Sequence, residues 1–331
     1  MINQSDLTML AKGDPVDHFL LVRRIELRST RTGSHYLSLE LGDKSGAFSA
    51  NVWDNFKELA KGGEVGDVVQ VKGVVEEFQN SPQIRVSAIR LSKKSDNVSP
   101  QDFLSKSVRN LNEMNDELTN RIKKIVQPQL RTLLENIFTG EELNKFTQAP
   151  AGKSWHHGYL HGLLEHTLEI IKICDLMCDI HTDLNRDLLI TGAMLHDFGK
   201  TEELKYDSAF EYTNDGKLIG HIVMAVVIVK DEIKSIPDFP KELERNLIHL
   251  ILSHQGKLEY ASPVVPKTVE AIVLYQADEL SAKVNAYKNV IASEIRGDSQ
   301  WTKFIMLAQT DLYKHNLENE SEGKNNKSLF D

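Results

Sequence analysis

The chain is poor in cysteine. Its 331 residues include only two, Cys174 and Cys178, which lie four positions apart in a helical pattern. No second pair is present that would complete a cysteine-based zinc site. We interpret both residues as small, reduced core side chains and expect a cytoplasmic protein.

Long hydrophobic runs are also missing. No apolar segment approaches 18 residues, so the sequence predicts no membrane-spanning helix. The first ten residues, MINQSDLTML, lack the charged-then-apolar pattern of a signal peptide, which favours a mature chain that starts here. The hydrophobic fraction of 40% can still build a substantial core, and the length suggests two or three domains.

Excess positive charge is absent as well. The net charge of -9 argues against a generic polyanion-binding protein. Residues 1–95 are nearly balanced, with 13 basic and 12 acidic side chains, so the acidity belongs to the remainder. An acidic segment that gathers metal ligands can still act on an anionic substrate, because bound cations are then the largest local charges.

The first 95 residues have the pattern of short β-strands. Leu37, Leu39 and Leu41 alternate with polar neighbours, as in a half-buried strand. Five such segments are rich in β-branched or aromatic residues, and a short helix at 54–67 separates the third from the fourth: 18–27, 35–43, 47–53, 68–78 and 83–91. This order predicts a five-stranded OB-like barrel, a fold that often binds single-stranded nucleic acid.

Candidate nucleic-acid contacts lie on these strands. The segment RRIELRSTR runs from a strand into a loop and has four arginines that could follow a phosphate backbone. Exposed aromatic rings could stack on bases, although core packing of each ring and simple solvation of each arginine remain alternatives. The predicted contacts are Arg23, Arg24, Arg28, Arg31, Tyr36, Trp53 and Phe78.

The rest of the chain is predicted to be helical. A polar linker at 92–101 ends the barrel, and we place connecting helices within 96–147, a helical domain at 148–314 and a disordered tail at 315–331. The helices between 102 and 147 have apolar stripes that fit two arrangements, packing on the helical domain or forming a homo-oligomer.

Polar residues recur on apolar helix faces in the helical domain. His166 shares a face with Leu163, Ile170 and Ile173, and the same analysis applies to four other segments. A single histidine of this kind is more often a satisfied core residue. Carboxylates are different, because they are almost never buried without a partner. The positions concerned are His166, His196, Asp197, His221, His254 and Asp278.

A shared cation site explains this pattern economically. No arginine or lysine recurs on the same faces to pair with the acids. Imidazole and carboxylate ligands suit manganese, iron, cobalt, nickel or zinc. Four imidazoles and two carboxylates are too many for one tetrahedral ion but fit two ions that share a carboxylate, the arrangement that clamps phosphoesters.

The order His, His-Asp, His, His, Asp on a helical scaffold resembles the HD-domain superfamily of metal-dependent phosphohydrolases. The OB-like segment, the helical connection and the motif SWHHGYLHGLLEHT tighten this likeness to the YhaM-type 3′-to-5′ exoribonucleases. The resemblance implies trimming of single-stranded RNA 3′ ends to nucleoside 5′-monophosphates, with single-stranded DNA as a second substrate. Manganese is the first choice of cofactor, ahead of cobalt, iron, nickel, magnesium or zinc.

Two positions depart from the family pattern. His161 stands where a glycine is expected, and we interpret it as an extra surface histidine in preference to a substrate contact. The segment SHQG has one histidine where some relatives with two metal ions have two in succession, which bears on the number of ions.

The resemblance also suggests residue roles. His166, His196, Asp197 and Asp278 would hold one ion, and Asp197, His221 and His254 the other. Lys200, placed by a turn at Gly199, could contact a phosphate oxygen, or could be a solvated cation at a helix end. His156 and His157 could donate to the phosphate or to the leaving oxygen, or could form a structural loop.

Two other functions fit parts of this pattern. The helical site alone would also suit hydrolysis of a small nucleotide such as an alarmone, a dNTP or a cyclic dinucleotide. A nucleic-acid-binding protein with a degenerate site is the second alternative. The OB-like segment argues against the first and the complete ligand set against the second.

Overall fold

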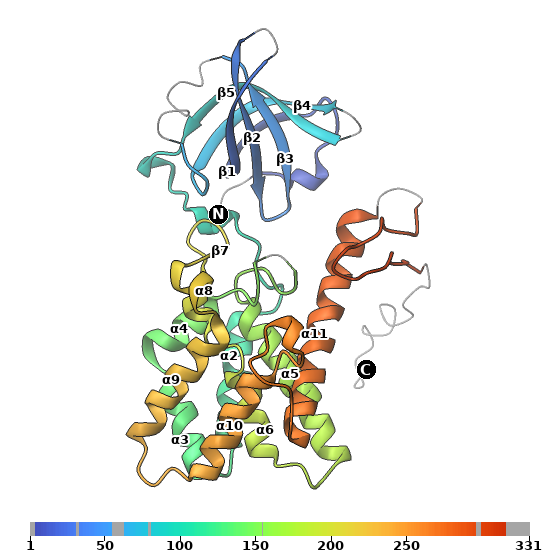
Figure 1. Ribbon diagram of the computed structural model, residues 1–331. Coiled ribbons are helices and arrows are strands. Elements are labelled where there is room, and N and C mark those ends of the chain that lie inside the picture. The colour runs from blue at the N-terminus through green and yellow to red at the C-terminus, as the bar shows by residue number, and fades with distance from the viewer. Residues whose placement is uncertain are drawn as a thin grey trace, which may run out of the picture.

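The computed structural model shows a β-barrel joined to a helical body (Figure 1) and describes residues 4–30, 33–54, 63–78, 81–153, 155–295 and 299–315. Three predictions lie wholly or mostly outside these described residues: the helix at 54–67, the candidate contact Arg31 and the tail at 315–331. Within the described parts of the chain, no helix has the length and apolar character needed to cross a membrane.

The barrel is closed by five strands in the order β1-β2-β3-β5-β4, with β4 returning to pair with β1. The β3–β5 pair is parallel and the other pairs are antiparallel. This confirms the predicted five-stranded barrel. The strands are β1 (Pro15–Ser29), β2 (His35–Asp43), β3 (Gly46–Val52), β4 (Val68–Phe78) and β5 (Ser81–Leu91).

Strand alternation builds the barrel interior. The predicted inward leucines of β2 are fully buried, and each faces an apolar residue of β3, as in the pair of Leu39 with Ala50. Burial of one leucine side chain stabilises the fold by about 2 kcal/mol. The intervening side chains of β2 and β3, such as Ser38, Glu40 and Ser49, therefore lie on the outer side of the barrel.

The helical body follows two short 3-10 turns, η2 (Lys94–Asp96) and η3 (Pro100–Phe103). Its buried apolar side chains form one large core. The longer helices are α2 (Leu111–Lys123), α3 (Pro128–Ile137), α4 (Gly140–Gln148), α5 (Gly162–Ile180), α6 (Arg186–Leu195), α9 (His221–Ser235), α10 (Lys241–Ser253) and α11 (Val269–Glu294).

A small hairpin interrupts the helical body. Between the short helices α7 (Lys200–Glu203) and α8 (Asn214–Leu218), the strands β6 (Leu204–Lys205) and β7 (Glu211–Tyr212) pair antiparallel. Strands of two residues are too short to show an alternating pattern, which is why the sequence did not predict them.

The barrel and the body meet at a separate apolar cluster. Leu21 and Val68 of the barrel pack with Phe103 and Leu104 of η3 and with Leu160 of the body. The connecting segment is therefore part of the packed structure rather than a free linker.

Candidate metal centre

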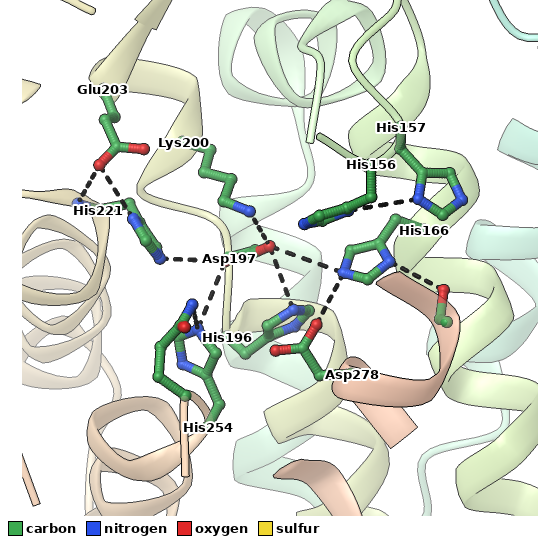
Figure 2. Close-up of polar contacts among 12 residues, drawn as sticks. His156, His157, His166, His196, Asp197, Lys200, Glu203, His221, His254 and Asp278 are labelled. Atoms are coloured by element: carbon green, nitrogen blue, oxygen red, sulfur yellow. Dashed lines mark hydrogen bonds and ion pairs between the residues drawn. The ribbon is translucent and has the colours of Figure 1, made fainter. Parts of the chain in front are cut away.

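The six predicted ligands converge in the helical body (Figure 2). They come from five helices that are distant in the sequence, and each stands where its apolar stripe faces the core. His166 lies on α5, His196 and Asp197 follow the end of α6, His221 begins α9, His254 follows the end of α10 and Asp278 lies on α11.

The Asp197 carboxylate is the hub of the cluster. Its Oδ1 faces the Nε2 atoms of His221 and His254 at 3.3 and 3.5 Å. Its Oδ2 faces the Nε2 atoms of His196 and His166 at 3.3 and 3.9 Å. Asp278 Oδ1 lies 3.0 Å from His166 Nε2. One carboxylate therefore presents an oxygen to each of two histidine pairs, as a bridging ligand would.

The four imidazoles share one orientation, with Nε2 toward Asp197 and Nδ1 away from it. His196 Nδ1 donates to the carbonyl of Ala193 at 2.9 Å, and His254 Nδ1 donates to the carbonyl of Ile251 at 2.7 Å. Because a carbonyl can only accept, these bonds assign a hydrogen to Nδ1, so the neutral form of each ring has its lone pair on Nε2. That tautomer is the one needed to bind a cation through Nε2.

Carboxylates orient the other two rings. His221 Nδ1 donates to Glu203 Oε1 at 3.0 Å. His166 Nδ1 donates to Ser281 Oγ at 3.0 Å, and this hydroxyl donates in turn to Glu169 Oε2 at 2.7 Å. Such outer partners raise the basicity of a ligating histidine and fix its position.

These three partners were not predicted from the sequence, although it contains a signal for two of them. Glu169 follows His166 by three positions, and Ser281 follows Asp278 by three, so each shares a helix face with a predicted ligand. Glu203 had no such signal, because it meets His221 only through the packing of α7 against α9.

The charges of the centre favour cation binding. Burial raises the pKa of Asp197, but the neighbouring Lys200 and His196 outweigh it and hold the pKa well below its usual range. For Asp278, burial is likewise outweighed by the adjoining imidazoles of His166 and His196, and the pKa is lowered. Burial lowers the pKa of His166 to about 4 and also lowers that of His254. The acids are therefore ionised while these two imidazoles are neutral.

The residues present fit a divalent cation. His196 Nε2, Asp197 Oδ1 and His221 Nε2 are buried atoms without a hydrogen-bond partner. Buried polar atoms of this kind are costly unless something satisfies them. His166 Nε2 and Asp278 Oδ1 are also two lone-pair bearers in close contact. Among the described residues, three groups of ligand atoms are close enough to share an ion, and two of them contain Asp197: His166, His196 and Asp197, and Asp197, His221 and His254. The third is His156, His157 and His166.

The turn at residues 196–199, which carries His196 and Asp197, is positioned by Phe198 and Gly199. Phe198 is fully buried in an aromatic cluster with Phe138 and Phe146, which anchors the turn in the core. Gly199 lies in the turn directly before Lys200, as predicted, and its backbone has an ordinary helical conformation. A Cβ at Gly199 would lie 2.0 Å from the carbonyl oxygen of His221. The glycine lets α9 approach the turn.

The two alternatives for Lys200 are separated by burial. Only 6% of the residue is exposed, and its Nζ lies 2.6 Å from Asp197 Oδ2. Burial lowers the pKa of Lys200, but Asp197 outweighs this effect and raises it, so the side chain is charged. Lys200 is therefore part of the centre and is not a solvated helix-end cation.

The predicted histidine pair divides into two environments. His156 is half-buried and lines an open cavity beside Lys200. Burial, with the neighbouring His166 and Lys200, lowers its pKa well below the usual value, so its imidazole is neutral. His157 is fully buried, and its Nε2 faces Glu169 at 3.3 Å. His157 is thus placed to support the centre from behind.

His161 is a structural residue. It is half-buried, and its Nδ1 donates to the carbonyl of Thr147 at 2.7 Å, so the side chain is tied to the end of α4. Its φ of +69° lies in the left-handed region, where a glycine is favoured. This conformation explains physically why the family pattern led us to expect glycine at the position.

Aromatic residues gather on the outer barrel surface. Tyr36 and Trp53 stack with ring centroids 4.4 Å apart, and Arg28 lies opposite Tyr36 in the β1–β2 pair. Trp53 is 53% exposed, so it does not close the barrel core. Phe78 is exposed at the end of β4, in the β4–β5 hairpin.

The predicted arginines differ in how far their guanidinium groups are already engaged by other residues. Arg24 is exposed, while Arg28 is exposed and paired with Glu26. Arg23 is exposed as well, but its guanidinium packs over Gly42 and donates to the carbonyl of Asp43, and partial burial of this group lowers its pKa. Arg24 and Arg28 are therefore better placed than Arg23 to contact a phosphate backbone.

An OB barrel followed by a helical domain with a His/Asp centre defines a class of two-domain proteins. Residues 21–92 match the family described as an OB-fold nucleic acid binding domain, and residues 163–283 match the HD domain family. HD domains are metal-dependent, and the His/Asp cluster described here could hold the metal.

Relatives cover almost the whole chain. A 3′-5′ exoribonuclease YhaM from Oceanobacillus iheyensis is 33% identical over 94% of this chain and 97% of its own length. The protein of the same name from Bacillus subtilis is 32% identical over 91% and 95%. The corresponding protein from Geobacillus sp. is 31% identical over 91% and 92%. The chain therefore belongs to the YhaM family.

Proposed function

We propose that the protein is a metal-dependent 3′-to-5′ exoribonuclease that trims single-stranded RNA and releases nucleoside 5′-monophosphates. The observation that carries the proposal is the convergence of four imidazole Nε2 atoms on the two oxygens of Asp197. The activity named for the relatives from Oceanobacillus iheyensis and Bacillus subtilis supports it.

Each half of the centre would hold one divalent ion, and manganese is our first choice. The first ion would bind His166, His196, Asp197 and Asp278, and the second would bind Asp197, His221 and His254. Bound ions of this kind supply positive charge to the scissile phosphodiester and acidify the attacking water.

Two further side chains act directly on the phosphate in this proposal. The Lys200 ammonium lines the cavity next to the centre, where it donates to a non-bridging oxygen as negative charge develops. His156 lines the same cavity and, as a neutral imidazole, donates a hydrogen bond to the phosphate or to the leaving 3′ oxygen. His157 is buried behind the centre and acts only by positioning.

The barrel would hold the RNA upstream of the cleaved end. The Tyr36–Trp53 stack offers a π-surface that accepts any base, and Arg24 and Arg28 offer charges for the backbone. Single-stranded DNA has the same features and is our second substrate. The free thiols of Cys174 and Cys178 fit our proposal of a cytoplasmic enzyme.

A labelled-oligonucleotide assay tests the function. The protein is incubated with Mn²⁺ and a single-stranded RNA labelled at the 5′ or the 3′ end. We expect the 5′-labelled strand to shorten one nucleotide at a time, and the 3′ label to be released at once as a mononucleotide. Internal cleavage, or hydrolysis of dNTPs and cyclic dinucleotides without loss of RNA, would contradict the proposal.

Asp197→Asn is the variant that tests the centre. The amide keeps the size of the buried carboxylate, whereas alanine would leave the Lys200 ammonium buried beside a void. We expect RNA hydrolysis to fall at least about 100-fold, the upper end for loss of an outer partner of a metal site, with the helical content unchanged. Near-normal turnover would show that Asp197 is not at the reacting centre.

A further inference from the structure

The β6–β7 hairpin lies at the end of the helical body that faces the barrel, where β7 is labelled (Figure 1). Tyr206 and Phe210, in and beside its loop, pack on the cluster that contains Leu21 and Val68 of the barrel. The two domains also approach closely here, because a Cβ on Gly66 of the barrel would lie 2.2 Å from Ser208 Oγ. The hairpin is thus docked on the barrel along its loop.

The other end of the hairpin reaches the mouth of the centre. There an open cavity of about 250 Å³ lies in front of His221 and Lys200. Two aromatic residues contribute to its wall: Tyr212 of β7 and Trp155 of the loop between α4 and α5. The remaining lining residues are Ala151, Gly152, Lys153, His156, Glu203 and Leu204.

The cavity has a polar side and an aromatic side, which suit the phosphate and the base of one nucleotide. Lys200, His156 and His221 lie on the side of the centre and are polar or charged, as a phosphate requires. Trp155 is half-buried and Tyr212 is 42% exposed, so both rings have free surface. Aromatic side chains bind bases of any sequence, because every base has a π-face. Lys153 is exposed and adds a positive charge to the wall.

We propose that this cavity binds the 3′-terminal nucleoside of the RNA, with Trp155 and Tyr212 as its base-stacking residues. The inference rests on the proposed function and names the substrate subsite of that same centre. A nucleoside bound in this cavity would have the phosphate on its 5′ side at the centre, which would account for removal of single nucleotides. The hairpin connects the two sites, because its loop packs on the barrel and Tyr212 at its other end lines the cavity.

A two-by-two comparison tests the subsite. The enzymes are the wild type and Trp155→Ala, and the substrates are two single-stranded RNAs that differ only in whether the 3′-terminal residue has a base. We expect Trp155→Ala to raise KM about tenfold on the RNA with a terminal base, the effect of losing one stacking contact. On the RNA with a terminal abasic residue, the two enzymes should have the same KM.

Tyr212→Ala should behave in the same way, while Trp155→Phe and Tyr212→Phe should retain most of the affinity because they keep a ring. Tyr260 is a matched control, since it is 47% exposed and lies on η4 (Leu258–Tyr260), outside the cavity. Tyr260→Ala should leave both substrates unaffected. An equal rise in KM on the two RNAs, or no rise with either alanine variant, would overturn the proposal.

Product binding separates this inference from the proposed function. If the wild type cleaved neither RNA, the exonuclease proposal would fail, and the subsite would be judged by the affinity for AMP in the presence of Mn²⁺. The expected result is about tenfold weaker AMP binding to Trp155→Ala than to the wild type, measured by calorimetry. Equal AMP affinity of the two proteins would overturn the subsite.

Discussion

Glu203 holds His221 through two hydrogen bonds to a single carboxylate oxygen. Glu203 Oε1 accepts from the backbone nitrogen and from Nδ1 of His221, both at 3.0 Å. His221 is the first residue of α9, so the same oxygen satisfies an unpaired helix donor and orients the imidazole. The opposite ring nitrogen is thereby directed at Asp197. The short helix α7 therefore positions the ligand His221 in addition to connecting the turn at 196–199 to β6.

Glu203→Gln should weaken metal binding without unfolding the protein. The amide keeps the shape of the side chain but removes the charge that makes the His221 imidazole a stronger ligand. We expect Mn²⁺ affinity to fall about 10- to 100-fold, measured by isothermal titration calorimetry. Glu202→Gln is the matched control, because Glu202 is paired with Lys145 on the outer surface. Equal affinity of both variants would contradict the role of Glu203.

Lys200→Met should impair catalysis more than substrate binding. Methionine has a similar length and no charge, so it removes the ammonium that we place beside the phosphate. We expect kcat on single-stranded RNA to fall about 100-fold while KM changes little, as for the loss of one transition-state donor. Mn²⁺ affinity is measured in parallel. If Lys200→Met turned over RNA at the wild-type rate, Lys200 would have no role at the phosphate beyond its ion pair with Asp197.

Substitutions at His161 should reveal the strain of its left-handed backbone. His161→Ala loses the hydrogen bond to Thr147 and keeps the unfavourable φ, whereas His161→Gly loses the same bond but removes the strain. Denaturant unfolding should therefore show the glycine variant to be more stable than the alanine variant by about 1 kcal/mol. The opposite order would show that the backbone is relaxed at this position.

Trp53→Ala should weaken the binding of long RNA and spare short substrates. The variant removes half of the stacked pair on the barrel surface, so we expect about tenfold weaker binding of a long single strand. Cleavage of a dinucleotide should be unchanged, because that substrate reaches only the centre. Trp301 is similarly exposed and lies after α11, so Trp301→Ala serves as the control. An equal loss on both substrates would contradict the holding role of the barrel.

Point variants are preferable to deletion of the barrel. Leu21 and Val68 cover Phe103, Leu104 and Leu160. Removing residues 1–95 would expose this apolar cluster to water, and a loss of activity would then reflect a damaged body as well as a missing RNA contact.

Metal removal should lower the stability of the folded protein. The centre brings together buried ionised acids and unpaired imidazole nitrogens, and an ion that binds only this folded arrangement stabilises it by mass action. At a free Mn²⁺ concentration about 100 times Kd, the gain is about 2.7 kcal/mol. We expect EDTA to lower Tm and Mn²⁺ to restore it, with a much smaller shift for Asp197→Asn. A Tm independent of Mn²⁺ would contradict metal binding.

Much of the fold was readable from local periodicity. The alternation around Leu37, Leu39 and Leu41 predicted β2 because a strand with one buried face repeats every two residues. The placement of His166 and Asp278 on apolar helix faces predicted a buried polar cluster for a related reason, since ionisable side chains are rarely buried without partners. The order of these elements then indicated both domains before their arrangement was known.

Other features depend on contacts that no periodicity encodes. Glu203 reaches His221 only because α7 packs against α9, and Tyr212 joins Trp155 only because a two-residue strand turns toward the cavity. Adjacent residues also separate, since His156 faces the cavity while His157 faces Glu169. Periodicity along the chain is enough to predict which side chains are buried and which elements present them. Which of these side chains meet depends on the tertiary structure, because burial acts on each element locally whereas contacts between elements depend on how their surfaces pack together.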